Sequence, residues 1–335
     1  MINHCQIVYN HVNCLNVKKE FVNICRLCID ACPHQAISMY YELNPRHCTE
    51  CGVCLAVCPS GGFVYRSSAK LFEYIKTTKK VVLSCPQAMQ AGYEIPCLGI
   101  LDRDLWMTLM LYAGEKELTI YTGVCSDCPD KEACRISVQT FKELHEAWKD
   151  HPQVKIKVVP DEGNSDIDET ISLDAQNKSK SLLKISREKF EAMMAGGVSD
   201  EIDPIPKTRQ FLEGTWKLRE PAIKALPLPV LTVSEGCINC GECSEICPQG
   251  ALTKKDSKEQ LTLIYEPLKC THCQRCVSIC RSKALRMGIR SLSYRLFTGK
   301  ILLHQGKRRF CLRCGQQVFD FFEPPLCMNC VSNNY

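Results

Sequence analysis

Two cysteine-rich stretches in the last third of the chain decide its fold. The first reads CINCGECSEICPQGAL from Cys237, and the second reads CTHCQRCVSIC from Cys270. Both have the spacing C-x2-C-x2-C-x3-C, and the second begins 33 residues after the first. Three thiolates on one tight loop can bind three irons of a cubane, whereas the fourth, at the start of the following helix, points away from that loop. Two complete copies indicate iron-sulfur clusters, against the alternatives of a disulfide framework or a zinc module.

The outward-pointing fourth cysteine predicts that each loop completes the cluster of the other loop. One expected ligand set is Cys237, Cys240, Cys243 and Cys280. The other expected set is Cys270, Cys273, Cys276 and Cys247.

The same pattern lies near the N-terminus, with one irregular position. One run is complete, with Cys48, Cys51, Cys54 and Cys58. The upstream run has Cys25, Cys28 and Cys32, but Val22 occupies its first position. Cys14 is the natural replacement, so we expect one cubane on Cys14, Cys25, Cys28 and Cys58 and another on Cys48, Cys51, Cys54 and Cys32. Cys5 is a rival for the irregular position, and a three-iron cluster there is a further alternative.

Both regions resemble the bacterial two-[4Fe-4S] ferredoxins, over about 60 residues each. The resemblance implies two modules, at 1–76 and 231–290, each with a β-α-β-β-α-β fold around two clusters. Aliphatic residues beside the motifs fit such cores, namely Ile37, Val53, Leu55, Val57, Ala251, Leu252, Val277 and Ile279. With full cysteine sets available, His34, His47 and His272 are expected to be loop residues and not ligands.

Between the modules, residues 77–160 predict a small parallel α/β domain. Apolar, β-branched runs at 80–84, 117–122 and 154–159 alternate with helical patterns at 101–113 and 133–149. This alternation favours a parallel βαβαβ layer. Five cysteines follow the strand ends, where open α/β sheets place their ligands: Cys85, Cys97, Cys125, Cys128 and Cys134. A metal or iron-sulfur site is therefore expected, with buried spare thiols as the alternative.

Two motifs of this domain, PCLGIL around Cys97 and TGVCSDC around Cys125 and Cys128, resemble the delta subunit of methyl-viologen-reducing hydrogenase. The resemblance covers about 80 residues and implies a [2Fe-2S] cluster that relays electrons to or from a second redox module. The chain departs from that pattern in having one cysteine at the first strand end and a tighter Cys125–Cys128 spacing. We expect Cys85, Cys97, Cys125 and Cys128 as ligands, with Cys134 as the spare.

Residues 161–230 have the character of a linker. The stretch 161–180 carries six acidic and two basic side chains without apolar periodicity. A helical pattern follows at 186–194. Five prolines between Pro204 and Pro229 then predict an extended, stiff connector. Docking of this segment as a strap across a partner is the functional alternative.

The C-terminal segment, 291–335, combines basic residues with four cysteines. Cys311, Cys314, Cys327 and Cys330 form C-x2-C-x12-C-x2-C, which resembles the broad class of zinc ribbons. One zinc ion is expected there, with rubredoxin-like iron as the rival. From Pro267 to Phe319 there are twelve basic residues and no acidic one. We expect them mainly to offset cluster charge, then to dock an acidic protein, and only last to bind nucleic acid.

Composition sets the remaining limits. Twenty-six cysteines in 335 residues, 45% hydrophobic residues and a formal net charge of +5 describe a multidomain α+β and α/β protein with real cores. No apolar run approaches a membrane span, and neither a Sec nor a twin-arginine signal is visible. The protein is therefore expected to act in the reducing cytoplasm. Disulfides do not persist in that compartment, so the cysteines are expected to serve another purpose.

The ligand count points to electron transfer. Sixteen cysteines serve four [4Fe-4S] clusters, four serve the central site and four the ribbon, while nucleotide and flavin fingerprints are absent from the sequence. We expect a polyferredoxin-type, non-catalytic subunit of a cytoplasmic anaerobic oxidoreductase, such as a hydrogenase, formate dehydrogenase or heterodisulfide-reductase-like assembly, with redox subunits as partners. The alternatives are an enzyme whose central cluster reduces a disulfide or small oxidant, and a redox-sensing nucleic-acid binder.

Overall fold

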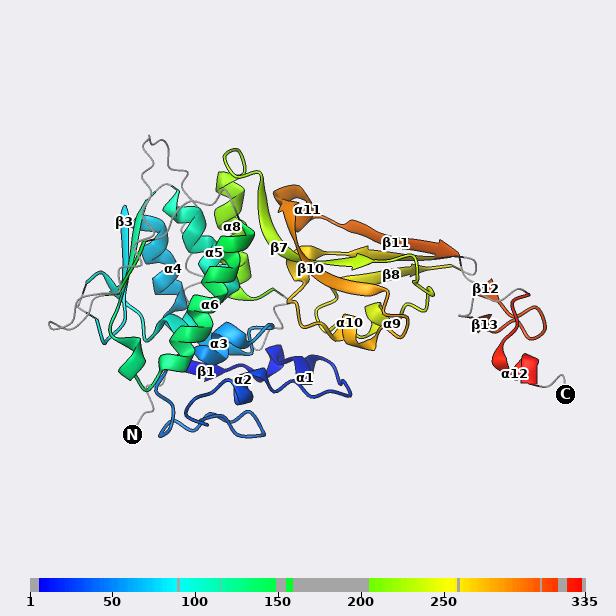
Figure 1. Cartoon of the computed structure of the whole chain (residues 1–335), viewed down its shortest axis with the longest axis horizontal. Coiled ribbons are helices and arrows are strands. Elements are labelled where there is room, and N and C mark those ends of the chain that lie inside the picture. Colours follow the sequence, from blue (N-terminus) through cyan, green and yellow to red (C-terminus); the bar gives the residue numbers. More distant parts are fainter. Residues whose placement is uncertain are drawn as a thin grey trace. The chain divides into compact units, whose positions relative to one another are not determined.

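The structure of the chain, a computed structural model, describes residues 6–88, 91–114, 116–148, 155–158, 205–257, 260–307, 309–318 and 324–332. It divides into two compact units (Figure 1), of which the first comprises Met1–Val17 and Val22–Ile223 and the second Lys18–Phe21 and Lys224–Tyr335. Cys5, the acidic stretch at 161–180 and the helix expected at 186–194 lie outside the described residues.

The first unit begins with a small module built on two cysteine-bearing helices, with a third short helix before them. Its elements are β1 (Ile7–Tyr9), the 3-10 turn η1 (His11–Asn13), α1 (Leu15–Lys18), α2 (Leu27–Asp30), α3 (Val53–Val57) and β2 (Phe63–Tyr65). Strand β1 pairs antiparallel with β2, and a bridge between Ile37 and Leu43 forms a minimal hairpin between the helices. This order is the expected β-α-β-β-α-β arrangement. Its core joins Ile7, Ile37 and Phe63 to the thiols of Cys28 and Cys54.

A parallel sheet forms the centre of the first unit. Its elements are α4 (Ser68–Thr77), β3 (Lys80–Ser84), β4 (Tyr93–Glu94), η2 (Leu98–Ile100), α5 (Arg103–Ala113), β5 (Glu117–Thr122), η3 (Cys125–Asp127), α6 (Lys131–Ala147) and β6 (Lys155–Val158). The strand order is β4-β3-β5-β6, and all three pairings are parallel. The expected parallel βαβαβ layer is confirmed. The short edge strand β4 was not anticipated from the sequence.

Helix α8 (Lys207–Arg219) differs from the extended connector expected over this segment. It packs along α5 (Figure 1), and the Arg209 guanidinium donates to the Asp104 carboxylate at 2.7 Å. Trp216 is fully buried, and Phe211 stacks on Phe72 of α4. Prolines therefore flank a regular helix, since Pro206 can precede the first turn without costing a hydrogen bond.

Helix α8 also explains the burial of α5. The sequence predicts a helix over 101–113, and in the structure every residue from Asp104 to Tyr112 is buried. Helix α8 covers the second face of α5. Two polar contacts join the helices: the Arg209–Asp104 ion pair, and a hydrogen bond in which the Thr208 hydroxyl donates to the Asp102 carboxylate at 2.6 Å. Helix α8, within the segment expected to connect domains, is thus part of the core of the first unit.

The second unit repeats the two-helix plan. Its elements are β7 (Ala225–Val233), α9 (Glu242–Glu245), β8 (Leu252–Asp256), β9 (Gln260–Tyr265), η4 (Pro267–Lys269), α10 (Arg275–Ile279), β10 (Leu285–Ser293), α11 (Tyr294–Thr298), β11 (Ile301–Lys307), β12 (Arg309–Phe310), β13 (Gln317–Val318) and α12 (Met328–Ser332). Strand β7 pairs antiparallel with β10 along nine residues, and β8 with β9 forms the central hairpin. Strand β11 adds to that hairpin, in the order β11-β9-β8 (Figure 1).

The prolines of β7 fit a two-stranded sheet. Pro227 pairs with Ser291 and Pro229 with Ile289. Residues two apart direct their backbone N positions to the same side of a strand, so both prolines can face away from β10. The first strand of the second unit therefore begins at Ala225, within the segment predicted as a connector.

The cores and surfaces agree with the sequence pattern only in part. Of the aliphatic residues expected in the module cores, Ile37, Val53, Ala251 and Leu252 are buried, whereas Leu55, Val57, Val277 and Ile279 are half-buried.

Within the described part of the chain, no helix combines the length and apolar character needed to cross a membrane.

Candidate iron-sulfur and metal sites

In the second unit, four cysteines surround one cavity. They come from the loop before α9, from α9 itself and from the end of α10: Cys237, Cys240, Cys243 and Cys280. The rest of the lining is mainly apolar, with Val233, Leu263 and Leu285. Burial and the neighbouring thiols raise the pKa of Cys243 to about 12. Four thiolates this close repel one another, so a cationic centre is needed to hold them ionised together.

A second cavity of the same unit is lined by the complementary set: Cys247, Cys270, Cys273 and Cys276. Leu231, Leu252 and Met287 close it. Burial raises the pKa of Cys273 to about 11, against the opposite effects of the Arg275 backbone N–H and guanidinium charge. Arg275 itself is 4% exposed and donates to the Lys19 carbonyl at 2.7 Å, so a buried positive charge acts on Cys273 from outside the cavity lining. The structure thus brings together both cysteine sets expected from the crossed pattern.

The fourth cysteine of each motif is fixed by a repeated turn. Three residues after it the backbone has positive φ, at Gln35, Gly61, Gly250 and Lys283. In three of the four motifs the next N–H then points back to the sulfur: Ala36 donates to Cys32 at 3.3 Å, Gly62 to Cys58 at 3.1 Å and Ala251 to Cys247 at 3.3 Å. Such N–H···S bonds stabilise negative charge on a sulfur ligand.

The regular motifs share a second backbone feature. Positive φ occurs at the residue before the second cysteine and at the residue after it, as at Asn239 and Gly241. Glu50 and Gly52, and His272 and Gln274, repeat this pair. Arg26, which follows Cys25 at the equivalent position of the upstream N-terminal motif, has instead a negative φ of −125°. The irregular cysteine spacing therefore coincides with an irregular loop.

In the first unit, Cys14 reaches the irregular site. The charges of Cys58, Cys25 and Cys14 add to burial in raising the pKa of Cys28 to about 12. A Cβ on Gly62 would lie 3.3 Å from the Cys58 Sγ and 3.5 Å from the Cys14 Cα, so these two cysteines flank Gly62. The structure brings Cys14, Cys25, Cys28 and Cys58 together, as the sequence predicted.

Asn16 anchors the insertion that separates Cys14 from Cys25. Its Oδ1 accepts from the Cys25 N–H at 2.9 Å, and its Nδ2 donates to the Cys25 carbonyl at 3.0 Å. The Tyr41 hydroxyl donates to the same carbonyl at 2.8 Å. Sequence reasoning missed both residues, because an asparagine and a tyrosine in a loop carry no pattern that marks them as clamps.

The remaining N-terminal cysteines gather around Cys54. Burial and the charges of Cys51, Cys48, Cys28 and Cys32 raise its pKa well above the usual range. Because Cys54 and Cys28 belong to the same buried cluster, the two N-terminal sites adjoin at these thiols. In the second unit Cys276 likewise responds to the charge of Cys243, which belongs to the other cavity.

The histidines near the motifs lie in loops. The His34 Nε2 is 2.6 Å from the Asp130 Oδ1, so this ring nitrogen is hydrogen-bonded to a carboxylate. His47 is exposed, and His272 is half-buried in a positive-φ turn.

The central cysteines converge from several loops. Cys85, Cys97 and Cys134 are buried, whereas Cys125 and Cys128 are half-buried. The Cys125 and Cys134 sulfurs are 3.3 Å apart. The hydrogen bond to Cys125, burial and the charges of Cys97 and Cys85 raise the pKa of Cys134. Cys134, which the sequence pattern leaves as the spare cysteine, therefore lies among the expected ligands.

The central thiols adjoin the N-terminal module within the first unit. A Cβ on Gly99 would lie 2.4 Å from the Cys51 carbonyl oxygen, and one on Gly52 would lie 2.2 Å from the Ile100 Cγ2. Asp130 accepts from the Thr49 hydroxyl at 2.7 Å, in addition to its contact with His34. Burial is the largest cause of the raised pKa of Cys97, to about 12, and the charge of Cys51 is the largest contribution from another thiol.

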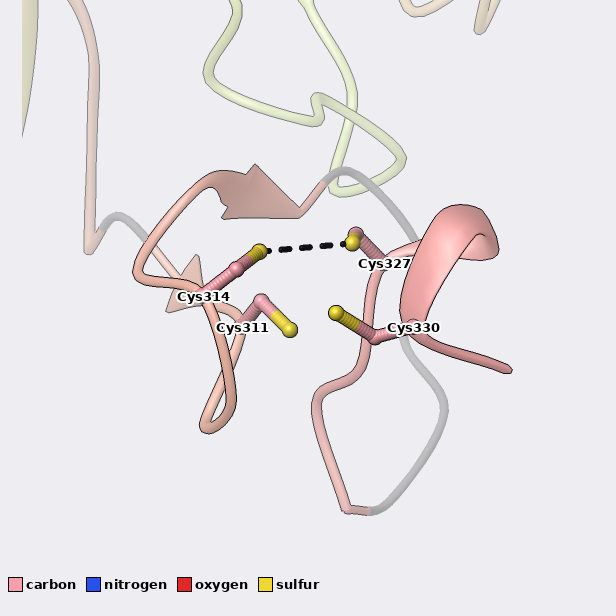
Figure 2. A group of neighbouring side chains, drawn as sticks. All are labelled: Cys311, Cys314, Cys327 and Cys330. Atoms are coloured by element: carbon pink, nitrogen blue, oxygen red, sulfur yellow. Dashed lines mark hydrogen bonds between the residues drawn. The ribbon is translucent and has the colours of Figure 1, made fainter. Parts of the chain in front are cut away.

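The C-terminal cysteines form a compact thiol group. All four sulfurs of Cys311, Cys314, Cys327 and Cys330 lie within 4.8 Å of one another (Figure 2). Cys311 and Cys314 come from the loop after β12, and Cys327 and Cys330 from the start of α12. The Cys314 and Cys327 sulfurs are 3.5 Å apart. Backbone N–H groups of Cys327 and Cys314 lower the pKa of Cys311 to about 6, which favours the thiolate that a metal binds.

The basic stretch of the second unit is partly neutralised by nearby acids. Arg281 pairs with Glu242 at 3.2 Å, and Lys269 with Glu266 at 3.0 Å. Lys300 approaches the same Glu266 at 3.7 Å. Both acids lie outside the stretch that contains no acidic residue, so the linear charge pattern overstates the local positive charge.

Two cysteine-rich segments of the chain match a known protein family. Residues 23–62 and 236–284 each match the family described as 4Fe-4S dicluster domain. The second segment contains all eight cysteines of its two cavities, whereas the first begins after Cys14. The chain thus carries two [4Fe-4S] dicluster domains, which support an iron-sulfur electron-transfer role. The central and C-terminal thiol groups lie outside both matches.

Proposed function

We propose that this protein is the electron-transfer subunit of a larger oxidoreductase complex, with four [4Fe-4S] clusters in its two dicluster domains. The observation that carries the proposal is the pair of cavities in the second unit, each lined by four cysteines from two motifs. The match of residues 23–62 to the dicluster family supports the same interpretation of the first unit. When bound, such a cluster takes up and releases one electron at a time.

The proposed ligands follow the crossed pattern. In the second unit they are Cys237, Cys240, Cys243 and Cys280, and Cys270, Cys273, Cys276 and Cys247. In the first unit they are Cys14, Cys25, Cys28 and Cys58, and Cys48, Cys51, Cys54 and Cys32. The charge effects among these thiols and the donor chemistry of four cysteines fit a cubane in each case.

The surrounding residues would tune these sites and exclude water. Apolar side chains such as Leu263 and Met287 limit solvent access to the two cavities. The N–H groups of Ala36, Gly62 and Ala251 stabilise added negative charge on the fourth cysteine, which raises the reduction potential.

Adjacent thiols supply the route for electrons. Within each domain the two sites meet at one pair of cysteines, Cys28 with Cys54 and Cys243 with Cys276. From the N-terminal domain the route continues to the central site, because the Cys51 loop touches the turn after Cys97. We propose that the central site holds a [2Fe-2S] cluster on Cys85, Cys97, Cys125 and a fourth thiol, which the sequence pattern assigns to Cys128.

The C-terminal thiols are proposed to bind one zinc ion as a structural ribbon. Four sulfurs within 4.8 Å suit the tetrahedral four-thiolate geometry of such sites. The partner class is a hydrogenase, formate dehydrogenase or heterodisulfide-reductase-like assembly in the cytoplasm, and it rests on the resemblance of the central domain to the hydrogenase delta subunit.

The proposal is tested by composition and redox titration of the intact chain. We expect anaerobically purified protein to contain about 18 iron, about 18 acid-labile sulfide and about one zinc per chain. Titration with dithionite should reduce it in several one-electron steps seen by EPR. About 8 iron with several zinc would contradict the proposal, since one dicluster domain would then hold no clusters.

A further inference from the structure

The sulfurs of Cys125 and Cys134 have the spacing of two ligands on one metal. They are 3.3 Å apart. A disulfide bond is about 2.05 Å long, so the two are not bonded. Two thiolates on a tetrahedral metal with bonds of about 2.3 Å stand about 3.8 Å apart. The observed separation is close to that value, and a small outward movement of either side chain would reach it.

Two close backbone contacts bring the other central cysteines to this pair. A Cβ on Gly123 would lie 2.3 Å from the Gln87 carbonyl oxygen, so the loop after Cys85 touches the loop that carries Cys125. A Cβ on Gly99 would lie 2.9 Å from the Ala133 Cβ, so the turn after Cys97 touches the residue before Cys134. Both contacts leave no space for a side chain. They draw the loops of Cys85, Cys97 and Cys125 and the start of α6, which carries Cys134, to one place.

Burial and the 3.3 Å contact with the Cys125 sulfur distinguish Cys134 from Cys128. Cys134 lies in the first turn of α6 and is buried, as are Cys85 and Cys97. The charges of Cys125, Cys97 and Cys85 all act on it. Cys128 is half-buried before that helix, and its sulfur accepts the Asp130 N–H at 3.4 Å.

We propose that the fourth ligand of the central iron-sulfur cluster is Cys134, together with Cys85, Cys97 and Cys125, and that Cys128 is not a ligand. The inference rests on the proposed function and replaces the ligand that the sequence pattern favoured. The C-x2-C spacing of Cys125 and Cys128 suggested a ligand pair, whereas a cysteine inside an amphipathic helix suggested a core residue. Because Cys134 lies in the first turn of α6, the start of this helix places its side chain beside the loops of the other three cysteines.

The test compares Cys134→Ser with Cys128→Ser in the full chain, purified anaerobically. Cys134→Ser should lose about two iron and about two sulfide per chain, together with the EPR signal of the [2Fe-2S] cluster recorded where cubane signals have broadened. Cys128→Ser should keep both. The reverse pattern, or retention of the signal in both variants, would overturn the proposal.

The cubanes distinguish this result from a failure of the proposed function. About 16 iron retained in Cys134→Ser shows that the dicluster domains are intact and that only the central site changed. If wild-type protein lacks that iron, the proposed function fails, whichever cysteine is the ligand. If Cys134→Ser does not fold, wild-type protein still decides the matter: anaerobic alkylation of the iron-loaded chain should label Cys128 and leave Cys134 protected. Protection of Cys128, or a Cys125–Cys134 disulfide in the freshly purified chain, would contradict the assignment.

Discussion

The carbonyl oxygen of Cys51 lies against Gly99, where a Cβ would stand only 2.4 Å from it. Real Cβ atoms do not approach a carbonyl oxygen this closely, so the contact requires glycine. The two residues belong to different thiol sites, because Cys51 lies in a cubane loop and Gly99 follows Cys97. Their contact makes the backbone of one proposed redox site the immediate neighbour of the next.

Gly99→Ala should therefore slow electron transfer between these sites while leaving their clusters in place. The added methyl group must push the Cys51 loop away, and it also meets the Ala133 Cβ at 2.9 Å. We expect unchanged iron content and several-fold slower reduction of the central cluster, followed by rapid-freeze EPR after mixing with dithionite. Gly214→Ala is the matched control, since nothing lies within 4 Å of a Cβ there. Equal rates in both variants would remove the contact from the route.

The irregular N-terminal site gives a second prediction, about its fourth ligand. Cys14→Ser should remove or degrade one cubane, with a loss of about one to four iron per chain. Cys5→Ser should leave the iron content unchanged. The measurement is iron and sulfide per chain with EPR, in which a three-iron signal from the oxidised Cys14→Ser variant would indicate a partly degraded cubane. Iron loss in Cys5→Ser alone would assign the position to the rival cysteine.

Much of the fold follows from local pattern. The cysteine spacing predicts the order of loops and helices in both dicluster domains, because iron chemistry fixes which thiols must converge. The strands at 80–84 and 117–122 were predicted residue by residue, since short β-branched runs between polar residues leave few alternatives. Their parallel pairing follows from the helix predicted between them, at 101–113.

The missed features depend on contacts distant in sequence. Helix α8 was interpreted as a connector because prolines flank it, and only burial of Trp216 and the Arg209–Asp104 ion pair against α5 shows that it belongs to a core. The position of Cys134 among the central thiols depends on where α6 begins relative to the strand ends. Neither relation leaves a periodic signal in the sequence.

The C-terminal thiol group predicts a metal content independent of the iron. Cys330→Ser should lower zinc from about one per chain to near zero and leave about 18 iron, because the ribbon shares no ligand with the other sites. Zinc and iron are measured together by inductively coupled plasma mass spectrometry. Loss of one iron in place of zinc would indicate a rubredoxin-like site on these four cysteines.

The buried charge of Arg275 predicts unequal reduction potentials in the second domain. Its positive charge stabilises the more negative reduced state of the site on Cys247, Cys270, Cys273 and Cys276. Arg275→Met should lower that potential by on the order of 50 mV. Arg281→Met is the control, because the Arg281 side chain is 77% exposed and solvent screens its charge. Equal shifts in both variants, in an EPR-monitored titration, would show that burial of the charge is unimportant.

Asp102 predicts a pH dependence of the first unit. It caps α5, accepting the Leu105 N–H at 2.8 Å, and burial together with the adjacent Asp104 raises its pKa to about 7 from the usual value of 3.8. Between these two pH values the folded chain binds a proton that the unfolded chain has released. The stabilising contribution is thus complete below about pH 4 and is lost as pH rises through about 7.

Asp102→Asn should remove this dependence and keep the cap, because asparagine is an equally good N-cap residue. We expect the melting temperature of the variant to exceed that of the wild type at pH 8 and to converge with it near pH 5, where the wild-type carboxyl is protonated. The measurement is anaerobic circular dichroism of both proteins at one scan rate. The comparison cancels contributions from the histidines, which titrate identically in both chains. A difference that stays constant between pH 5 and pH 8 would mean that Asp102 remains ionised throughout, held by Thr208 and by the Arg209 that also binds Asp104.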